Sequence, residues 1–495
     1  MRAAVFLLAC VLLPAQLHAE SFEEYKRRIS SDFQEYKDAR DKEFVDFLKK
    51  QWSEFQGFKG IPRYQKPKPR TIPPAPPKPA VKAPPAAPAP AKPLPPAAPP
   101  TPAKEPPRIV AEPVKPLPPM VVPPQPKLPL DPSKKIAEIE YFGVTARFAY
   151  DPKTRQPLSA LNQDGISRYW SELSKTDYDP LLAQLREQQK RLKLNDWGTF
   201  LLIDKLSHQI NDGQERESVL LSWFLLAKLG YDCKVGYNDQ RVYLMVAVSH
   251  MVYQTAFFKD EHKTYYCLDT TGRLSDVGKL YSFKGSYPDA NHQLSFAIPE
   301  NPLLPATVKK RTLSFSYDGH TYNIEAEYEP ALVAYYAHYP QSDYPVYFTA
   351  QVSDAATSAL LAQLAPLLRG RSEQDATNLL LRFVQTAFRY QTDDQQFNYE
   401  KVMLPEETLY YPYSDCEDRA ILFAYLVRNL LNLRVVALLY PGHLATAVAL
   451  PGKTEGDMFS YKGTVYTVAD PTYINANIGM AMPQFRNSQY KVIEM

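Results

Sequence analysis

The sequence predicts an α+β fold built from a helix followed by an antiparallel sheet, with this unit present twice. An apolar run of helical character at 420–427 is followed by two strand-like runs before residue 472. A similar order of helix and strands spans residues 220–271. Residues 311–327 alternate between apolar and polar side chains about Asp318-Gly319, a strong hairpin signal. These patterns together indicate mixed helices and antiparallel strands.

Composition divides the chain into five parts. Most of its 47 prolines lie between residues 61 and 133, and the stretch that follows is long enough for two ordinary domains. The formal net charge of +3 gives no strong attraction to nucleic acid, and we find no nucleic-acid-binding module. We expect a signal peptide (1–19), an aromatic-repeat helix (20–60), a Pro/Ala/Lys-rich linker (61–134) and two modules (135–305 and 306–495).

Residues 1–19 have the pattern of a secretory signal. Arg2 precedes an apolar core, and Leu17-His18-Ala19 forms the expected cleavage site. The core is shorter than the roughly 20 residues that a membrane-spanning helix needs. We therefore expect an exported protein of the periplasm or cell envelope, without a transmembrane segment.

Export would leave three cysteines, and an odd number in an oxidising compartment indicates at least one free thiol. A Cys233–Cys267 disulfide would leave Cys416 as that thiol. The sequence does not place the first two side by side, so their pairing stays open.

Residues 22–58 carry an eleven-residue aromatic repeat. Eleven residues in three turns is close to the period of a straight helix, so the aromatic side chains form one stripe. Such a stripe needs a cover, which is a partner protein, a second copy of the helix or the body of this protein. The repeated residues are Phe22, Phe33, Phe44 and Phe55, followed three positions later by Tyr25, Tyr36, Phe47 and Phe58.

The linker, 61–134, cannot form a core, because it consists mainly of proline, alanine and lysine. This composition favours a disordered chain with extended polyproline conformation. It serves either as a basic spacer that reaches along an acidic envelope layer or as a plain tether.

Other elements follow from local patterns. We expect a strand-like run at 137–150, a helical region at 179–208, and helices at 354–369 and 372–389, the last begun by a Ser372/Asp375 capping pair.

Cys416, His443 and Asp470 form a candidate nucleophile system. Cys416 opens the helical run, where unpaired N–H groups and a partial positive charge favour a thiolate and can hold an oxyanion. His443 begins a strand and can transfer the proton, while Asp470 follows the next strand and can orient the imidazole. Taken singly, each has a structural interpretation: a buried thiol, a hydrogen-bonded histidine and a turn aspartate.

The first module lacks these groups. Aligning Leu229 with Leu431 places Gln214 at the position of Cys416. Val242 and Tyr243 lie near the position of His443, and Asp269 matches Asp470. The first module is therefore expected to be a degenerate copy, unless the similarity is a coincidence of a common pattern.

Three sequence motifs resemble the transglutaminase-like superfamily. They are Asp415-Cys416-Glu417-Asp418, Gly442-His443 and Val468-Ala469-Asp470-Pro471-Thr472. The closest resemblance is to the bacterial transglutaminase-like cysteine proteinases, which have a papain-like fold, and it covers about residues 350–485. It implies amide-bond chemistry through an acyl-enzyme, with Cys416 as nucleophile, His443 as base and Asp470 as orienting acid.

The resemblance also raises two points about the site. Some of these proteinases bind calcium through acidic residues beside the cysteine, which would fall on Asp415 and Glu417, although such carboxylates more often cap the helix. All four tryptophans lie outside the second module, so the indole that stabilises the oxyanion in animal transglutaminases has no match. This favours hydrolysis over cross-linking, with Tyr411, Tyr413 or Gln385 as candidates for lining the cleft or donating to the oxyanion.

Three functions therefore compete. The first is an exported thiol hydrolase, a peptidase or amidase acting on an envelope protein or peptide. The second is a non-catalytic scaffold with transglutaminase-like modules and a partner-binding or self-associating helix at 22–58. The third is an acyl transferase that uses an amine as acceptor.

Overall fold

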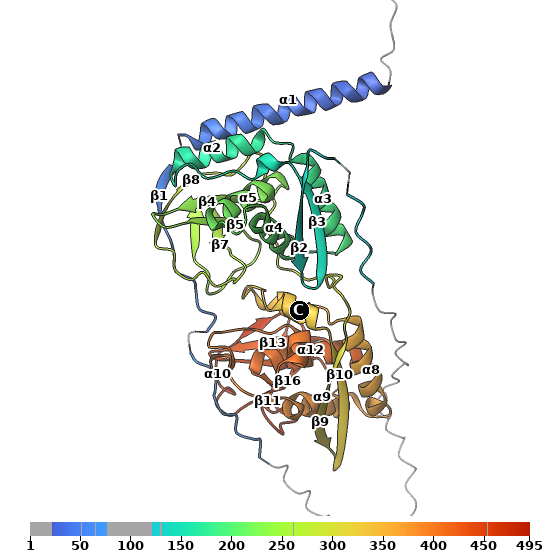
Figure 1. Ribbon diagram of the computed structural model, residues 1–495. Helices are drawn as coiled ribbons and strands as arrows, with labels where there is room; N and C mark the ends of the chain where they lie inside the picture. The colour runs from blue at the N-terminus through green and yellow to red at the C-terminus, as the bar shows by residue number, and fades with distance from the viewer. Residues whose placement is uncertain are drawn as a thin grey trace, which may run out of the picture.

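The computed structural model describes residues 22–50, 52–64, 66–76, 121–128, 131–260, 262–452 and 454–495. The expected signal peptide and most of the expected linker lie outside these residues. Figure 1 shows two bodies of mixed helix and sheet, which confirms the α+β class. Within the described part of the chain, no helix is both long and apolar enough to cross a bilayer.

The N-terminal body combines a hairpin, several helices and a sheet. Its strands β4, β5, β7 and β6 follow α5, which packs on β4 and β5 and is almost wholly buried. The six-stranded antiparallel sheet has the order β1-β8-β4-β5-β7-β6. The elements are β2 (Lys135–Tyr141), β3 (Val144–Tyr150), α2 (Gln163–Ser174), α3 (Asp179–Arg191), α4 (Asp196–Ile210), α5 (Glu215–Lys228), β4 (Cys233–Tyr237), β5 (Val242–Ala247), β6 (Phe257–Asp260), β7 (Lys263–Cys267) and β8 (Lys279–Phe283).

The aromatic-repeat segment is a helix only in part. Helix α1 (Phe22–Leu48) ends well before residue 60, and strand β1 (Trp52–Gln56) pairs with β8. The helical period stops because this pairing extends the sheet, where Phe55 packs against the apolar cluster on one face. Tertiary pairing overrides the local repeat.

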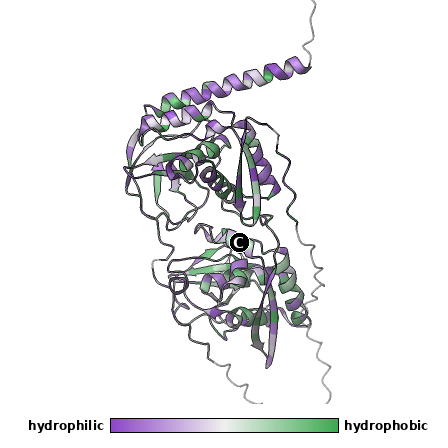
Figure 2. Cartoon of the chain, in the orientation of Figure 1, coloured by the Kyte–Doolittle hydropathy of each residue, from purple (hydrophilic) through white to green (hydrophobic). Residues whose placement is uncertain are grey.

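The C-terminal part of α1 belongs to the N-terminal body. Phe44 is 2% exposed, and its ring lies 4.8 Å from that of Trp170 and 5.2 Å from that of Tyr287. At this end of the helix, the aromatic stripe is therefore covered by the protein's own body. Figure 1 shows the other end of α1 extending beyond the body, and Figure 2 colours that end largely hydrophilic. A partner for it remains a prediction.

The C-terminal body packs one long helix against a second antiparallel sheet. Helix α12 lies on β13 and β14, and the sheet order is β15-β16-β14-β13-β17. The elements are β9 (Lys309–Tyr317), β10 (His320–Tyr328), α6 (Pro330–Tyr336), α7 (Tyr344–Phe348), α8 (Asp354–Leu368), α9 (Glu373–Ala387), β11 (Arg389–Tyr390), α10 (Asp393–Gln396), α11 (Pro405–Tyr410), β12 (Tyr413–Ser414), α12 (Cys416–Leu431), β13 (Val435–Tyr440), β14 (His443–Val448), β15 (Met458–Tyr461), β16 (Thr464–Ala469) and β17 (Lys491–Ile493).

Local sequence signals in this body are confirmed. Strands β9 and β10 pair in register on either side of Asp318 and Gly319, which have φ values of 50° and 75° as a tight hairpin turn requires. The Ser372 hydroxyl accepts a hydrogen bond from the backbone N–H of Asp375 at the start of α9. The strand-like run at 137–150 is instead a hairpin, because residues 142 and 143 both adopt positive φ.

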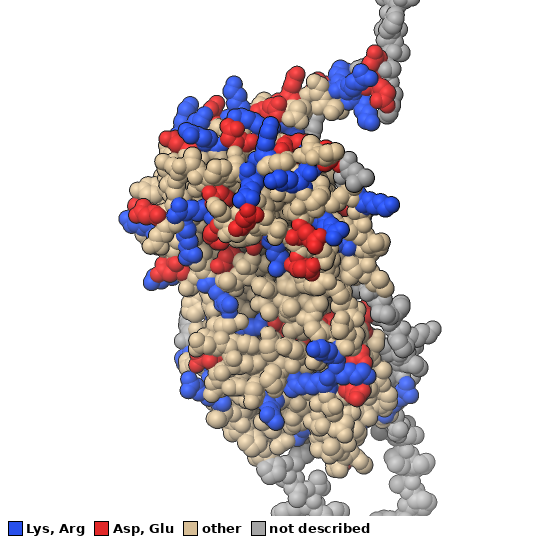
Figure 3. Space-filling model, viewed as in Figure 1, with Lys and Arg blue, Asp and Glu red and all other residues tan. Residues whose placement is uncertain are grey.

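The two bodies meet through tyrosine side chains that follow β10. Tyr335 donates a hydrogen bond to Asn195 of the N-terminal body, and Tyr339 donates to the carbonyl of Phe296. On the face shown in Figure 3, basic and acidic side chains are mixed on the N-terminal body, so no patch of a single sign dominates it.

Cys233 and Cys267 are both free and buried. Cys233 pairs in register with Val246, whereas Cys267 pairs with Met245, the next residue along β5. Neighbouring strand residues point to opposite faces of a sheet, so the two thiols lie in different apolar clusters. The Cys233–Cys267 disulfide that the sequence allows is therefore not formed.

Candidate active site

Cys416 is the first residue of α12, as the sequence predicts. The preceding residue, Asp415, caps the helix, and its backbone N–H donates to Oδ2 of Asp418 at 3.0 Å. Arg419 fixes the same turn from below, since its guanidinium donates to the carbonyls of Gln385 and Phe388. Cys416 is 0% exposed. The nucleophile candidate thus sits at a rigid, closed helix start.

His443 and Asp470 are in direct contact. Nε2 of His443, the first residue of β14, lies 2.9 Å from Oδ2 of Asp470, which directly follows β16. The other oxygen of Asp470 accepts backbone N–H groups of Thr472 and Tyr473 and is thereby held in place. Nδ1 of His443 is buried and has no hydrogen-bond partner among the described residues. One ring nitrogen is therefore oriented and the other is free to take a proton.

Residues 61–76, which we call the strap, cross this site (Gln65 is outside the described residues). In Figure 1 this segment leaves β1, passes to the C-terminal body and runs along it beside α10. The sequence assigns these residues to a disordered linker, but their side chains are pinned to the C-terminal body at several points. This difference arises because an extended, proline-rich chain can dock through side chains and carbonyls without forming regular structure.

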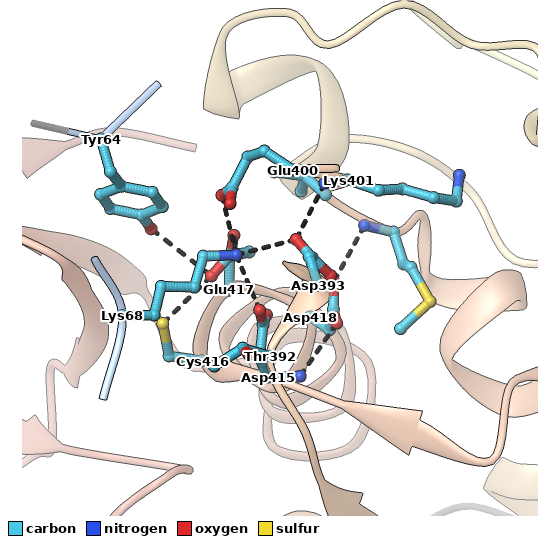
Figure 4. A network of polar contacts seen from close by, with 12 residues as sticks. Tyr64, Lys68, Thr392, Asp393, Glu400, Lys401, Asp415, Cys416, Glu417 and Asp418 are labelled. Atoms are coloured by element: carbon cyan, nitrogen blue, oxygen red, sulfur yellow. Dashed lines mark hydrogen bonds and ion pairs between the residues drawn. The ribbon is translucent and has the colours of Figure 1, made fainter. Parts of the chain in front are cut away.

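Lys68 of the strap is the cation of the site. Its buried ammonium lies 2.8 Å from Asp393, 2.8 Å from Glu400 and 2.7 Å from Asp415, and it also pairs with Glu417 (Figure 4). Two of these carboxylates flank Cys416. No sequence motif marks Lys68, since it is one of several lysines in a proline-rich stretch.

The carboxylates around Lys68 hold very different pKa values. Burial would raise the pKa of Glu417, but the Lys68 ammonium holds it at about 2. Burial and the charge of Glu417 raise the pKa of Glu400 to about 8. Burial together with Asp393 and Glu417 raises the pKa of Asp415 well above its usual range. Lys68 thus lowers the pKa of Glu417, whereas burial and the neighbouring acidic groups raise the pKa values of Glu400 and Asp415.

The same surroundings keep the Cys416 thiol neutral. Burial raises its pKa well above the ordinary value, the charges of Glu417 and Asp415 raise it further, and Lys68 opposes them. The thiol donates to Oε2 of Glu417 at 3.0 Å. The described arrangement therefore buries the sulfur and raises the pKa of the thiol.

The strap ties the cysteine and histidine sides of the site together. A Cβ on Gly442, which precedes His443, would lie 2.8 Å from the carbonyl oxygen of Pro67 and 3.1 Å from that of Lys66. The next strap residue, Lys68, binds the carboxylates beside Cys416. Adjacent residues of an extended chain are less than about 4 Å apart, so one short stretch spans both sides.

Other expected site residues have structural roles. The Gln385 amide group donates to the carbonyls of Asp470 and Ala476, so it is not free to bind an oxyanion. The Tyr411 ring packs 5.0 Å from that of Phe397. Tyr413 lies in β12, which pairs with β11. Asp415 and Glu417 bind Lys68 as described above.

The N-terminal body has no matching nucleophile or base. Gln214 precedes α5, and Val242 begins β5 where His443 begins β14. Asp269 accepts backbone N–H groups of Thr271 and Gly272, as an aspartate in a turn does. Within the described residues, the candidate Cys-His-Asp set is thus found in the C-terminal body alone.

Comparison of the chain with models of protein families, with curated proteins and with solved structures finds no match.

Proposed function

We propose that this protein is an exported thiol hydrolase that cleaves peptide or amide bonds through an acyl-enzyme. The observation that carries the proposal is the state of His443: Nε2 is bound to Asp470, whereas Nδ1 is buried and unpartnered. The strand of His443 packs against the helix that Cys416 begins. A thiol at a helix start and a carboxylate-oriented imidazole on the strand packed against that helix are the groups that thiol catalysis needs.

The two sheets support a duplicated transglutaminase-like fold. The strand order β8-β4-β5-β7-β6 after α5 corresponds strand by strand to β17-β13-β14-β16-β15 after α12. The five matching strands of each sheet are antiparallel and follow the helix in the chain. We infer that the N-terminal body is the copy without catalytic residues.

In the first half-reaction, Nδ1 of His443 accepts the thiol proton of Cys416. The thiolate attacks the substrate carbonyl carbon, and the carbonyl electrons move to oxygen. Backbone N–H groups in the first turn of α12 are the candidates for binding this oxyanion, aided by the partial positive charge of the helix start. The tetrahedral intermediate collapses to a thioester while the imidazolium protonates the leaving amine.

In the second half-reaction, water replaces the amine. Nδ1 of His443 takes a proton from water, and hydroxide adds to the thioester carbonyl. The C–S bond then breaks to release the carboxylic acid, and the imidazolium returns its proton to the departing Cys416 sulfur. Asp470 holds Nε2–H throughout and stabilises the imidazolium.

Calcium at Asp415 and Glu417 remains a separate proposal. In the closed arrangement the charge of these carboxylates is balanced by the Lys68 ammonium. Calcium takes six to eight oxygen ligands, so it would have to displace Lys68 from this position. The mechanism above uses no metal.

The proposal is tested with a strap-loosened chain, Ala75→Glu. Ala75 is buried with Tyr473, Ala476 and Met482, far along the strap from Lys68, so a carboxylate there should release the strap and leave the site intact. The chain is incubated with a peptide pool, and new amino termini are counted by mass spectrometry. We expect cleavage, which Cys416→Ala abolishes in the same background and Cys267→Ala leaves in place. Unchanged cleavage by the Cys416→Ala chain would sink the proposal.

A second candidate is a non-catalytic scaffold, and the buried, neutral thiol of Cys416 favours it. In that case Cys416 should resist iodoacetamide even in the Ala75→Glu chain. Acyl transfer, the third possibility, is detected in the same assay as incorporation of a labelled primary amine.

A further inference from the structure

The strap is bound as an extended peptide would be bound. Its contacts use side chains and backbone carbonyls rather than a strand ladder. The Arg63 guanidinium lies 4.5 Å from the ring centres of both Tyr253 and Tyr344. Tyr390 donates a hydrogen bond to the carbonyl of Pro69, and Ala75 donates its N–H to the carbonyl of Ile474. The surface beneath the strap is thus a groove that holds an extended chain.

The centre of this groove is a pocket for one ammonium group. Asp393, Glu400, Asp415 and Glu417 come from three separate segments and converge on Lys68 Nζ (Figure 4). The neighbouring Lys66 is exposed, whereas Lys68 is buried. The groove therefore distinguishes position 68 from position 66.

Two buried atoms show that the occupant does not complete the site. Oδ1 of Asp415 and Nδ1 of His443 have no hydrogen-bond partner among the described residues. A cavity of about 410 Å³ also opens beside Lys68, between the strap and the loop of Asp393 and Glu400. The strap fills the ammonium pocket but leaves these two buried polar atoms without a partner, as expected for a ligand that is not turned over.

We propose that the four-carboxylate pocket recognises a lysine side chain of an extended peptide substrate, and that Lys68 occupies it in the closed enzyme. This inference rests on the proposed function, because it names the substrate class of the same site. It follows that substrate binding requires the strap to leave, and that a lysine positioned near the scissile bond selects the substrate.

The test measures binding separately from turnover. The protein is the full chain carrying Cys416→Ala together with Lys68→Ala, and the probe is a fluorescent synthetic peptide with the sequence of residues 61–76. Two further peptides carry Lys68→Met or the matched control Lys66→Met. We expect the parent and Lys66→Met peptides to bind alike. The Lys68→Met peptide should bind about 30-fold more weakly, because it loses one partner of a buried charge pair.

The Cys416→Ala chain that retains Lys68 should bind the parent peptide about tenfold more weakly than the chain that carries both Cys416→Ala and Lys68→Ala. The reason is that its own strap fills the groove. Should Lys68→Ala fail to give a cooperative melting transition, Ala75→Glu replaces it in the same comparison, with all four carboxylates and Lys68 present. Equal affinity for the parent and Lys68→Met peptides, or no binding of either, would overturn the proposal.

The outcome is separable from the proposed function. Lysine-selective binding without hydrolysis by the corresponding chain that retains Cys416 would support the lysine pocket and contradict the proposed hydrolase activity. Hydrolysis without a preference for lysine would support the hydrolase activity and contradict the lysine pocket.

Discussion

The ammonium of Lys68 lies 2.7 Å from Oδ2 of Asp415, the residue directly before Cys416, although 347 positions separate them in the chain. This pair joins the proline-rich segment to the start of α12. It also sets the charge around the sulfur, because Lys68 opposes the rise in the pKa of Cys416 that burial and the nearby carboxylates cause. The strap therefore acts on the site in two opposite ways, by covering the thiol and by neutralising its acidic neighbours.

Gly442→Ala should detach the strap. Gly442 has a φ of 78°, and an added Cβ would press against two strap carbonyls. Gly463 is a matched control, since its φ is 77° and its Cβ would meet nothing within 4 Å. Both substitutions cost the left-handed strain of about 1–2 kcal/mol, but only Gly442→Ala should add a clash cost of about 1–3 kcal/mol. Denaturant unfolding measures the difference, and equal losses would show that the strap does not press on this loop.

The sequence predicts the local elements of the C-terminal body well. The start of α12 at Cys416, the start of β14 at His443 and the turn at Asp318-Gly319 each depend on residues close in the chain. The acidic pocket could not be predicted in this way. Lys68, Asp393 and Glu400 are brought together only by docking of the strap, and a lysine among prolines carries no signal of its partner.

The end of α1 shows the same limit of prediction from sequence, here for a secondary-structure boundary. The eleven-residue repeat predicts a helix to residue 60, yet the chain turns after Leu48 because β1 completes the edge of a sheet whose other strands lie beyond residue 232. A periodic pattern specifies which side chains need cover, whereas the cover itself is a long-range contact.

Glu400 should make stability depend on pH. Burial and Glu417 raise its pKa to about 8, whereas the unfolded chain releases this proton near pH 4.3. The folded protein therefore binds the extra proton between these values, and the contribution of Glu400 to stability falls as the pH rises from about 5 to 8. Glu400→Gln cannot titrate, so its stability relative to wild type should increase over this range, by at most about 1.4 kcal/mol per pH unit. Parallel curves for the two proteins would contradict the shift.

Phe44→Ala should destabilise the N-terminal body. The ring is 2% exposed and packs against Trp170 and Tyr287, so its removal should cost about 3–5 kcal/mol. Ile29→Ala, on the same helix but 46% exposed, should change stability by less than about 0.5 kcal/mol. Thermal unfolding compares the two. A small effect of Phe44→Ala would mean that α1 is not part of the folded body.

The protein should contain no disulfide between Cys233 and Cys267. Their side chains lie on opposite faces of the sheet, so a bridge would require the strands to turn over. Peptide mapping of protein secreted into an oxidising compartment, without reductant, should recover both as free thiols. A Cys233–Cys267 linked peptide would refute the observed register.

His443 should control the titration of Cys416 once the strap is released. Burial is the largest cause of the raised pKa of the thiol in the closed state, so in the Ala75→Glu chain iodoacetamide should alkylate Cys416 at lower pH than it does in wild type. Adding His443→Ala should move the titration back upward, because the imidazolium no longer stabilises the thiolate.

Asp470→Asn, added to the Ala75→Glu chain, tests the role of the carboxylate that holds His443. The amide retains the shape of the carboxylate but does not stabilise the imidazolium, so peptide cleavage should fall about 100-fold or more. Alkylation of Cys416 should still occur, since the sulfur and its helix start are unchanged. The rate of Cys416 alkylation is measured against pH in three chains. They are Ala75→Glu alone, Ala75→Glu with His443→Ala, and Ala75→Glu with Asp470→Asn. If the profiles coincide with and without His443, the imidazole does not act on Cys416 and the proposed enzyme has no base.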